Sequence, residues 1–474
     1  MAATPLRHGA DFTEGSIPRH LLRFAWPMFL GNILQALYNT VDSFWVGRML
    51  GPEALGAVSV GFPIIFALVA VVMGIGMATT VLVSQYTGAR RPEDVRRVVH
   101  NSLALLALAS VVATSVGIVF HRPLLRLINT PQEIEDLAAS YLIWYMGGLF
   151  FMFVYNALGA ILRGLGDSRT PLLFLVYATV LNIVLDPVLI FGWGPFPRLG
   201  VAGAALATDA AQAISAVLGL LHLYRVNRLI SLRPGAYRID LGLTWQMVKI
   251  GLPVGVQQTL VSLGGLAVSA VVNRFGKVIV AAVAAASRLD QFALLPAMSV
   301  GLAVSAVVGQ NLGAGKKGRV SETVHWSLLL TCGITAFITL AALFIPRPLL
   351  AIFTTDRAVL DTGTTYLRIV GLSYVPFAAM FAFTGVLRGA GDTIPTMFIT
   401  LFSLWLVRVP LAYFLSRFPA LGPRGVWWAI AFSPFVGMTL SYLVYASRRW
   451  EQRVIARRGA PENDGEEEGE YAPL

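Results

Sequence analysis

The chain has 474 residues, of which 56% are hydrophobic and 13% charged, and its mean hydropathy is +0.70. Soluble domains carry about 25% charged residues, so this composition excludes a soluble globular protein and predicts a polytopic membrane protein. The single cysteine, Cys332, lies in an apolar run. It excludes a disulfide within the chain and argues against a thiol-based active site.

The first residues are polar and contain no apolar stretch or small-residue cleavage site of the signal-peptide type. We therefore expect residues 1–19 to form a cytoplasmic tail and the first apolar segment to insert by itself.

Twelve apolar segments follow, each long enough to cross a bilayer. The predicted fold is an all-α polytopic membrane protein with twelve transmembrane helices in two six-helix lobes. The predicted spans are 20–49, 54–86, 97–119, 137–162, 170–193, 200–226, 244–274, 278–310, 323–345, 363–387, 394–417 and 423–447. The predicted domains are a first lobe at 20–226, a basic cytoplasmic linker at 227–243, a second lobe at 244–447 and a charged cytoplasmic tail at 448–474.

Basic residues predict the orientation of these spans. The loops on the side of the two termini hold 23 lysines and arginines, and the opposite loops hold 11. Because cytoplasmic loops are enriched in positive charge, both termini are expected in the cytoplasm. The net charge of +11 is then mostly a consequence of topology rather than a sign of nucleic-acid binding. We expect a multi-pass protein of a bacterial or archaeal-type cytoplasmic (inner) membrane.

The two halves repeat short motifs at a constant offset. Arg163-Gly-Leu-Gly-Asp167 recurs as Arg388-Gly-Ala-Gly-Asp392, and Gln85-Tyr-Thr-Gly-Ala89 recurs as Gln310-Asn-Leu-Gly-Ala314, each 225 positions later. Such a repeat predicts two lobes related by a pseudo-twofold axis along the membrane normal, which can rock against each other to alternate access. For the paired Arg/Asp loops we favour a structural role at the cytoplasmic helix ends.

The first span contains a carboxylate. Residues 24–41 form a stretch of 18 residues without a formal charge, roughly 27 Å long as a helix, and Asp42 follows it. Six residues fall on one side of this helix: Met28, Gly31, Gln35, Tyr38, Asn39 and Asp42. A carboxylate at membrane depth is expensive unless it faces protein or water, so Asp42 is a functional hypothesis, with a structural Asp as the alternative.

Other acids within spans also lie mainly in the first lobe. Asn182 and Asp186 are four residues apart and share a helix face. Two carboxylates with amide and hydroxyl oxygens can take up a proton or a sodium ion. The second-lobe segment that aligns with Asn182 and Asp186 has Arg408 and no acid, so we expect ion coupling in the first lobe. We leave open the roles of Asp209, Arg288, Asp290 and Arg408. For Arg408 we favour a structural or snorkelling role.

At this point the sequence resembles a known family. Residues 24–51, the RGLGD and RGAGD loops, LNIVLDPVLIFG at 181–192, LGVAGAALAT at 199–208 and GLPVGVQQ at 251–258 are similar to the multidrug and toxic compound extrusion (MATE) transporters. The resemblance spans residues 16–450. It implies a V-shaped arrangement of twelve helices around a central cleft, and export of drug-like, often cationic, compounds driven by inward proton or sodium flow.

The resemblance also implies roles for individual residues. Asp42 would be the coupling carboxylate, with Asn182, Asp186 and Thr208 as companions and as the possible Na⁺ ligands. Gln35 and Asn156 would line the substrate cavity, to which we add Tyr38, Asn39 and Met28 from the polar side of the first helix. Pro27 would be the point where this helix bends, and we expect the pivot near Pro27 and Gly31.

The second lobe lacks the acids that the sodium-driven NorM-like branch carries in helices 7 and 10, so the sequence looks closer to the DinF-like branch. We expect a proton-coupled multidrug antiporter. The alternatives are a Na⁺-coupled antiporter with the same site, or a flippase for lipid-linked precursors. The sequence contains no histidine cluster with ligand spacing and no Walker A motif, so we do not expect an enzyme. We expect no cofactor beyond the coupling ion, no nucleic-acid partner, and a monomer in the lipid bilayer.

Overall fold

The computed structural model describes residues 9–194, 196–225, 229 and 239–456, and within these residues it contains helices and no strand. Eleven of the described helical stretches are long and apolar enough to cross a membrane. The first helix has 33 residues, enough for a twelfth crossing, and its polar side lowers its hydropathy. Most of the predicted linker and of the acidic C-terminal tail lies outside the described residues.

The helix bounds follow the predicted spans closely, with several helices extending beyond the bilayer-length core. The first half contains α1 (Ile17–Met49), α2 (Pro52–Gly88), α3 (Pro92–Leu127), α4 (Gln132–Gly164), α5 (Arg169–Phe191) and α6 (Val201–Arg225). The second half contains α7 (Leu241–Val272), η1 (Asn273–Phe275), α8 (Lys277–Gly313), α9 (Lys317–Phe344), α10 (Pro346–Ala351), α11 (Arg357–Val370), η2 (Gly371–Ser373), α12 (Tyr374–Gly389), α13 (Thr393–Thr400), the π-helical η3 (Leu401–Arg408), α14 (Val409–Leu415), α15 (Pro423–Ala446) and η4 (Arg449–Arg453).

Local sequence signals set several of these ends. Pro52, Pro92 and Pro423 occupy the first turns of α2, α3 and α15, where a missing backbone N–H costs nothing. The Asp356 carboxylate accepts from the N–H groups of Ala358 and Val359 at the start of α11. Gly192 ends α5 in the left-handed conformation, with φ at 75°.

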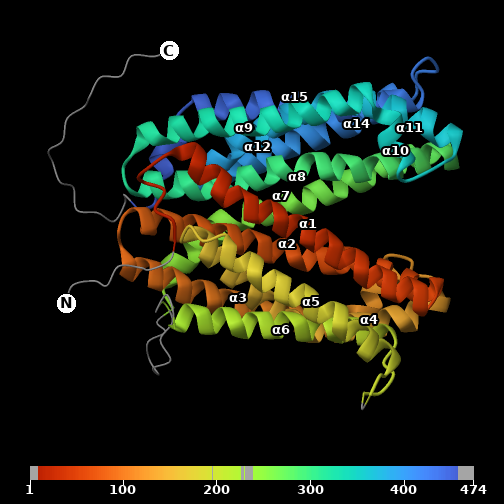
Figure 1. Ribbon diagram of the computed structural model, residues 1–474, viewed down its shortest axis with the longest axis horizontal. Helices are drawn as coiled ribbons and strands as arrows, with labels where there is room; N and C mark the ends of the chain where they lie inside the picture. The colour runs from red at the N-terminus through yellow and green to blue at the C-terminus, as the bar shows by residue number, and fades with distance from the viewer. Residues whose placement is uncertain (1–8, 195, 226–228, 230–238, 457–474) are drawn as a thin grey trace.

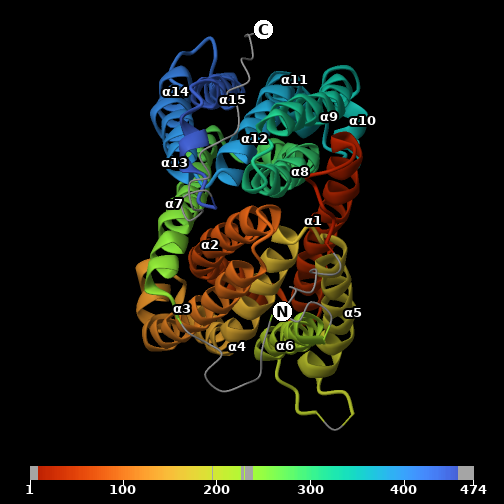
Figure 2. The ribbon, with the colours of Figure 1, turned by 90° about the vertical axis from the view of Figure 1, so that its left-hand side faces the viewer.

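The helices form two groups, which Figure 2 shows as separate layers. The first lobe contains α2 to α6, and the second lobe contains α8 to α15. Both ends of the described chain lie at one end of the bundle, where α1 begins and α15 ends (Figure 1). We call this the terminal end and the other the opposite end.

Helix α1 belongs to both lobes. In its first turns Ile17, Leu21 and Phe24 are buried in the apolar core of the second lobe, against α8 and α9. Further along, Val46 is buried in the core of the first lobe. Figure 2 shows the helix running from one group to the other. The predicted domain boundaries treat this segment as part of the first lobe alone, and the structure divides it between the two.

Helix α7 makes the reciprocal crossing. Near its start Met247 and Ile250 are buried in the core of the first lobe, whereas Val271 and Val272 at its end pack in the second. It crosses α2 closely, since a Cβ atom on Gly74 would lie 2.3 Å from the carbonyl oxygen of Gly251. Each lobe therefore holds the first turns of the other lobe's leading helix.

The lobes touch at the terminal end through a glycine crossing. A Cβ atom on Gly88 would lie 1.9 Å from the carbonyl oxygen of Gln310, and one on Gly313 would lie 1.9 Å from the carbonyl oxygen of Gln85. No side chain fits in either place, so α2 and α8 approach each other backbone to backbone. The two contacts are related by the 225-residue repeat.

The repeated glutamines join each lobe to the other lobe's RGxGD loop. Gln85 donates from Nε2 to the carbonyl oxygen of Gly389 at 2.9 Å, and Gln310 donates to that of Gly164 at 3.3 Å. Both side chains are buried. The duplicated motifs thus have a structural role in closing the terminal end, in agreement with the role favoured for the loops.

The segments around Phe12 and Ile455, near the two ends of the described chain, pack at the same junction. The Oε1 atom of Gln310 accepts from the N–H of Phe12 at 3.0 Å, and that of Gln85 accepts from the N–H of Ile455 at 2.9 Å. Phe12 is fully buried, and Arg319 donates to its carbonyl oxygen. Residues 9–16, predicted as part of a tail, are therefore packed into the interface between the lobes.

A half-buried acid, Asp290 on α8, organises the opposite end of the second lobe. Its carboxylate accepts from the hydroxyl of Tyr366 at 2.7 Å and from that of Tyr374 at 2.5 Å. Arg408, the last residue of η3, interacts with it electrostatically and donates from Nε to the Ser433 hydroxyl at 2.6 Å. Such a carboxylate is fully solvated by protein, which explains how it is tolerated at this depth.

Arg288 has a different partner. Its guanidinium lies 6.0 Å from the centre of the Phe353 ring, while Asp290 bonds the two tyrosines. Residues two apart on a helix point in different directions, as the sequence indicates. Tyr374 is 2% exposed, and its hydroxyl donates to Asp290.

The glycine crossing predicts a conformational variant. Gly313→Val places side-chain atoms where the Gln85 backbone lies, so the terminal end should no longer close. We expect spin labels on Arg97→Cys and Glu322→Cys, in a Cys332→Ala background, to move to longer distances. Gly333→Val in α9 is the matched control, because nothing lies within 4 Å of a Cβ atom there. Unchanged distances in Gly313→Val would contradict this role.

The Asp290 cluster predicts a loss of stability. Tyr374→Phe removes one of two hydroxyl donors and should lower the free energy of unfolding by about 1.5–3 kcal/mol, the range for hydrogen bonds to charged groups. Thermal unfolding of the purified protein measures this. Tyr442→Phe is the control, since Tyr442 is 52% exposed and its hydroxyl makes no hydrogen bond with another described residue. Equal stability of the two variants would argue against the cluster as a stabilising element.

Candidate functional site

Helices α5 and α6 bring three of the predicted site residues together. Asn182 donates from Nδ2 to Oδ1 of Asp186 at 3.0 Å, one helical turn away, and to the Thr208 hydroxyl on α6 at 3.5 Å. Asn182 and Asp186 are completely buried, and Thr208 is nearly so. The four-residue spacing on α5 is what places the amide against the carboxylate.

Helix α1 adds Tyr38 and Asp42 to this group. Asp42 interacts electrostatically with Asp186, and Tyr38 interacts with both carboxylates and with Thr208. Tyr38 is 7% exposed and Asp42 is half-buried. The four residues expected to couple transport to an ion therefore converge, although they come from three helices.

This cluster holds more acceptors than donors. Four buried oxygen atoms of the cluster have no hydrogen-bond partner in the described structure: the Tyr38 hydroxyl and three acceptors, Oδ1 of Asp42, Oδ1 of Asn182 and Oδ2 of Asp186. Buried polar atoms are normally paired, so unpaired acceptors indicate room for a proton or a cation. Carboxylate, amide and hydroxyl oxygens suit hard cations. No group of three His, Cys, Asp or Glu residues able to hold a metal ion occurs in the described residues.

Asp209 follows Thr208 in sequence, but its side chain packs against α4 instead of α5. Its carboxylate packs against Gly148 of α4, where a Cβ atom would lie 1.8 Å from its Cγ. Tyr141 and Tyr145 interact electrostatically with both Asp209 and Asp42. These tyrosines are therefore close enough to both acids to interact with each. Sequence reasoning missed both, because a tyrosine in an apolar run carries no distinguishing signal.

The predicted cavity residues occupy different environments. Gln35 and Asn39 are exposed, and Nε2 of Gln35 lies 3.5 Å from Oδ1 of Asn39. Asn156 donates to the carbonyl oxygen of Met152 in its own helix. Met28 packs against the core of the second lobe. The exposed amides at membrane depth indicate a polar surface beside the ion cluster, and Met28 lies nearer the junction of the lobes.

Pro27 and Gly31 lie where α1 passes from one lobe to the other. Pro27 is buried beside the second-lobe contacts, and Asn32 donates to the Ser299 hydroxyl of α8 at 3.1 Å. A Cβ atom on Gly31 would be 3.8 Å from Leu175 of α5, which is ordinary packing distance. The missing i→i−4 hydrogen bond at a helical proline makes this the weakest point of α1.

Comparison with known families gives two matches within this one chain. The family model described as MatE matches residues 27–188 and again residues 253–414. The two matches begin at Pro27 and Pro253, and each spans most of one lobe. They agree with the internal repeat in the sequence.

Curated relatives match almost the whole chain. A protein of Bacillus subtilis named "Probable multidrug resistance protein YpnP" is 31% identical over 93% of this chain and 97% of its own length. "Probable multidrug resistance protein NorM" of Thermotoga maritima is 27% identical over 93% and 95%. A protein of Shewanella oneidensis named "FAD transporter" is 28% identical over 86% and 89%.

Solved structures share the fold. A crystal structure of MATE in the bent conformation matches with a TM-score of 0.86 and 25% identity, over 93% of this chain and 98% of that one. An outward-facing multidrug resistance MATE family transporter matches with a TM-score of 0.85 and 25% identity, over 93% and 97%. Together with the family model, these matches confirm the resemblance and the all-α polytopic fold. The chain belongs to the MATE family of multidrug efflux transporters, which are membrane transporters and not enzymes.

Proposed function

We propose that this protein is a secondary active antiporter that exports amphipathic, often cationic, compounds in exchange for protons. The observation that carries the proposal is the group of unpaired buried oxygens on Asp42, Asn182 and Asp186. A proton entering this group neutralises a carboxylate and supplies the missing donor. The group spans α1 and α5, so its occupancy changes how these two helices attract each other.

The orientation follows from charge. The terminal end is the basic end of the molecule, and the positive-inside rule assigns it to the cytoplasm of a bacterial or archaeal-type cytoplasmic membrane. In the described conformation the lobes are joined there by Gln85, Gln310 and both chain ends. This conformation is therefore closed toward the cytoplasm, and we treat the protein as a monomer in the bilayer.

Protons are favoured over sodium by the geometry of the cluster. The Asn182 amide already donates to Asp186, and Thr208 is only a distant acceptor at 3.5 Å. A sodium site would need these oxygens to turn toward a common centre. Sodium coupling through Asp42, Asn182, Asp186 and Thr208 is the alternative. The proton assignment agrees with the resemblance to the DinF-like branch.

The transport cycle follows from the position of α1. Protonation of the Asp42–Asp186 pair from outside removes their mutual repulsion, and α1 repacks about Pro27 and Gly31. Because the first turns of α1 are anchored in the second lobe, this movement acts on the lobe interface. Substrate leaves outward, the terminal end opens, and the proton leaves to the cytoplasm as new substrate binds.

The substrate surface is a mixture of amide and apolar groups. Gln35 and Asn39 are exposed, and so are the apolar side chains of Phe62, Met73 and Phe292. Such surfaces accept varied flat molecules. Relatives named multidrug resistance proteins and one named FAD transporter indicate that cargo varies among similar chains. A lipid-linked precursor flippase would need a cationic cavity, whereas the first-lobe spans hold Asp42, Asp186 and Asp209.

The proposal predicts which gradient drives efflux. In everted vesicles an imposed pH gradient without sodium should drive dye transport, and a sodium gradient at clamped pH should not. Asp42→Asn should abolish the pH-driven transport, because its side chain cannot exchange a proton. Ser43→Ala, at the next residue of α1, is the control for expression and packing, because Ser43 is exposed and its hydroxyl donates to a carbonyl oxygen of its own helix. Transport driven by sodium alone would reassign the cluster to Na⁺, and transport under neither gradient would favour the flippase.

A second variant separates the two ions. Thr208→Val keeps the shape of the side chain and removes its oxygen. The lost hydrogen bond costs only about 1 kcal/mol, so pH-driven efflux should stay within about tenfold of wild type. A sodium site would lose a ligand and with it most of its Na⁺-dependent transport. Proteoliposomes under each gradient distinguish these results, and loss of pH-driven efflux would show that the hydroxyl takes part in proton uptake.

A further inference from the structure

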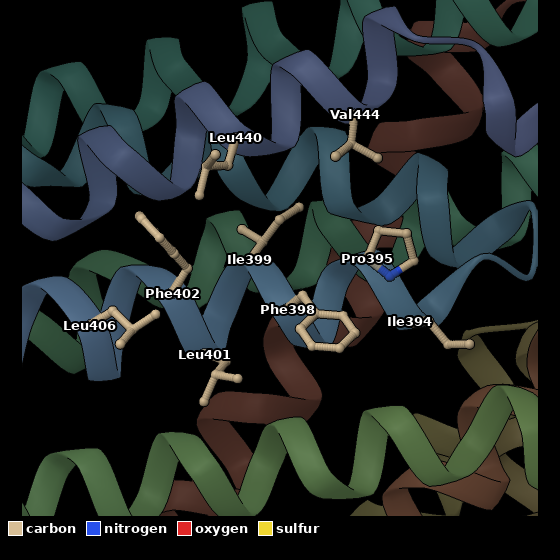
Figure 3. Close-up of a pocket in the computed structure, with 9 residues that line it drawn as sticks. All are labelled: Ile394, Pro395, Phe398, Ile399, Leu401, Phe402, Leu406, Leu440 and Val444. Atoms are coloured by element: carbon tan, nitrogen blue, oxygen red, sulfur yellow. The ribbon is translucent and has the colours of Figure 1, made fainter.

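A groove runs along the membrane face of the second lobe, away from the ion cluster. It lies between α13 with η3 on one side and α15 on the other, and its volume is about 460 Å³. Figure 3 shows side chains from both helices around it, with Leu440 and Val444 on one wall. The groove is lined by Ile394, Pro395, Phe398, Ile399, Leu401, Phe402, Leu406, Leu440 and Val444.

Every lining residue of this groove is apolar. Phe398 is 56% exposed and Leu406 61% exposed, so the groove lies on a face that lipid covers. Apolar surface alone does not define a site in a membrane, since lipid tails contact all such faces. The concave shape does, because a chain inside it touches protein on two sides and gains dispersion contacts that a flat face does not offer. Its volume is typical of ligand pockets, about 300–1,000 Å³.

The groove continues into a charged cavity at the terminal end. This second cavity has a volume of about 420 Å³ and shares Ile394, Pro395 and Val444 with the first. Its remaining walls are formed by Asp392, Leu443, Ser447, Arg449 and Arg453. The apolar groove therefore leads directly to two arginines, Arg449 and Arg453, at the terminal end.

The charges at this mouth are unequal. Arg453 interacts electrostatically with Asp392. Arg449 is exposed and has neither an ion pair nor a side-chain hydrogen bond with any described residue. The nearby acid Glu451 is paired with Lys317 at 2.8 Å. The mouth thus carries net positive charge, with guanidinium donors free to bind a phosphate.

We propose that this groove binds one anionic phospholipid, with an acyl chain between α13–η3 and α15 and the phosphate at Arg449 and Arg453. Basic pockets between helices on the cytoplasmic side are suited to anionic headgroups. The site is separate from the transported cargo and adds a ligand to the proposed function. A lipid held there packs against η3, the π-helical segment that ends at Arg408, and so supports the Asp290 cluster from its outer side.

Native mass spectrometry of the full-length protein tests this directly. Purified protein is delipidated and titrated with palmitoyl-oleoyl phosphatidylglycerol, or with the zwitterionic phosphatidylethanolamine of the same chains. We expect one phosphatidylglycerol to be retained in preference to phosphatidylethanolamine. Arg449→Gln should weaken this binding about fivefold, the effect of one arginine at an anionic surface. Leu440→Trp, which fills the groove, should abolish retention of phosphatidylglycerol.

Matched variants separate the site from general effects. Arg424→Gln removes an arginine at the other end of α15, and Leu329→Trp adds a bulky side chain to an exposed position on α9, 56% exposed and outside the groove. Both should bind phosphatidylglycerol like the wild type. If Leu440→Trp does not fold, Val444→Phe fills the same groove at the boundary of the two cavities.

Three results would overturn the proposal. Equal retention of the two lipids would exclude a site selective for anionic headgroups. Unchanged binding in Leu440→Trp or Val444→Phe, with loss in Arg449→Gln, would leave a headgroup contact without an acyl site. Displacement of the lipid by glycerol 3-phosphate at equal concentration would show that a free phosphate suffices. Proton-driven dye efflux is measured for the Leu440→Trp protein from the same preparation. Loss of lipid binding with normal efflux concerns the lipid site alone, whereas absence of efflux in the wild type would contradict the antiport proposal.

Discussion

The cost of holding a carboxylate at membrane depth determines how each lobe is built. A charged group there must be paired or hydrogen-bonded, or it must lose its charge. Asp290 meets the first condition, with two tyrosine hydroxyls and Arg408 around it. Asp42 and Asp186 meet it only in part, since each keeps an oxygen without a partner although Asp186 accepts from Asn182. One lobe therefore contains a carboxylate with a donor for each oxygen, and the other contains the carboxylates to which we assign the proposed proton uptake.

The crossing helices connect this charge to the rest of the molecule. If α1 packed only within the first lobe, neutralising Asp42 would adjust one bundle internally. Its first turns lie instead in the core of the second lobe, where Leu21 and Phe24 are buried. Any rotation or bend between Phe24 and Asp42 must move one lobe relative to the other or strain the junction. The position of Pro27 between these anchors gives that movement a defined place.

Much of this arrangement can be predicted from sequence, because it depends on local patterns. Apolar runs define the spans, the four-residue spacing of Asn182 and Asp186 gives a shared face, and the repeated motifs imply two lobes. The exchange of α1 and α7 between lobes cannot be predicted in this way, because both helices are apolar on most sides and fit either core. Tyr366 and Tyr374 were missed for a similar reason, since nothing near them in sequence marks Asp290 as their partner.

The repeated and the diverged residues serve different needs. Gln85 and Gln310, with the glycines beside them, make equivalent contacts at the terminal end, so the lobes can separate there without one resisting more than the other. The residues at membrane depth have no such equivalence, because Asp186 corresponds to a segment that carries Arg408. A symmetric junction favours neither direction of rocking, and under the proposed mechanism the asymmetric charge sets when rocking occurs. Duplication alone supplies the first property, and only divergence between the halves supplies the second.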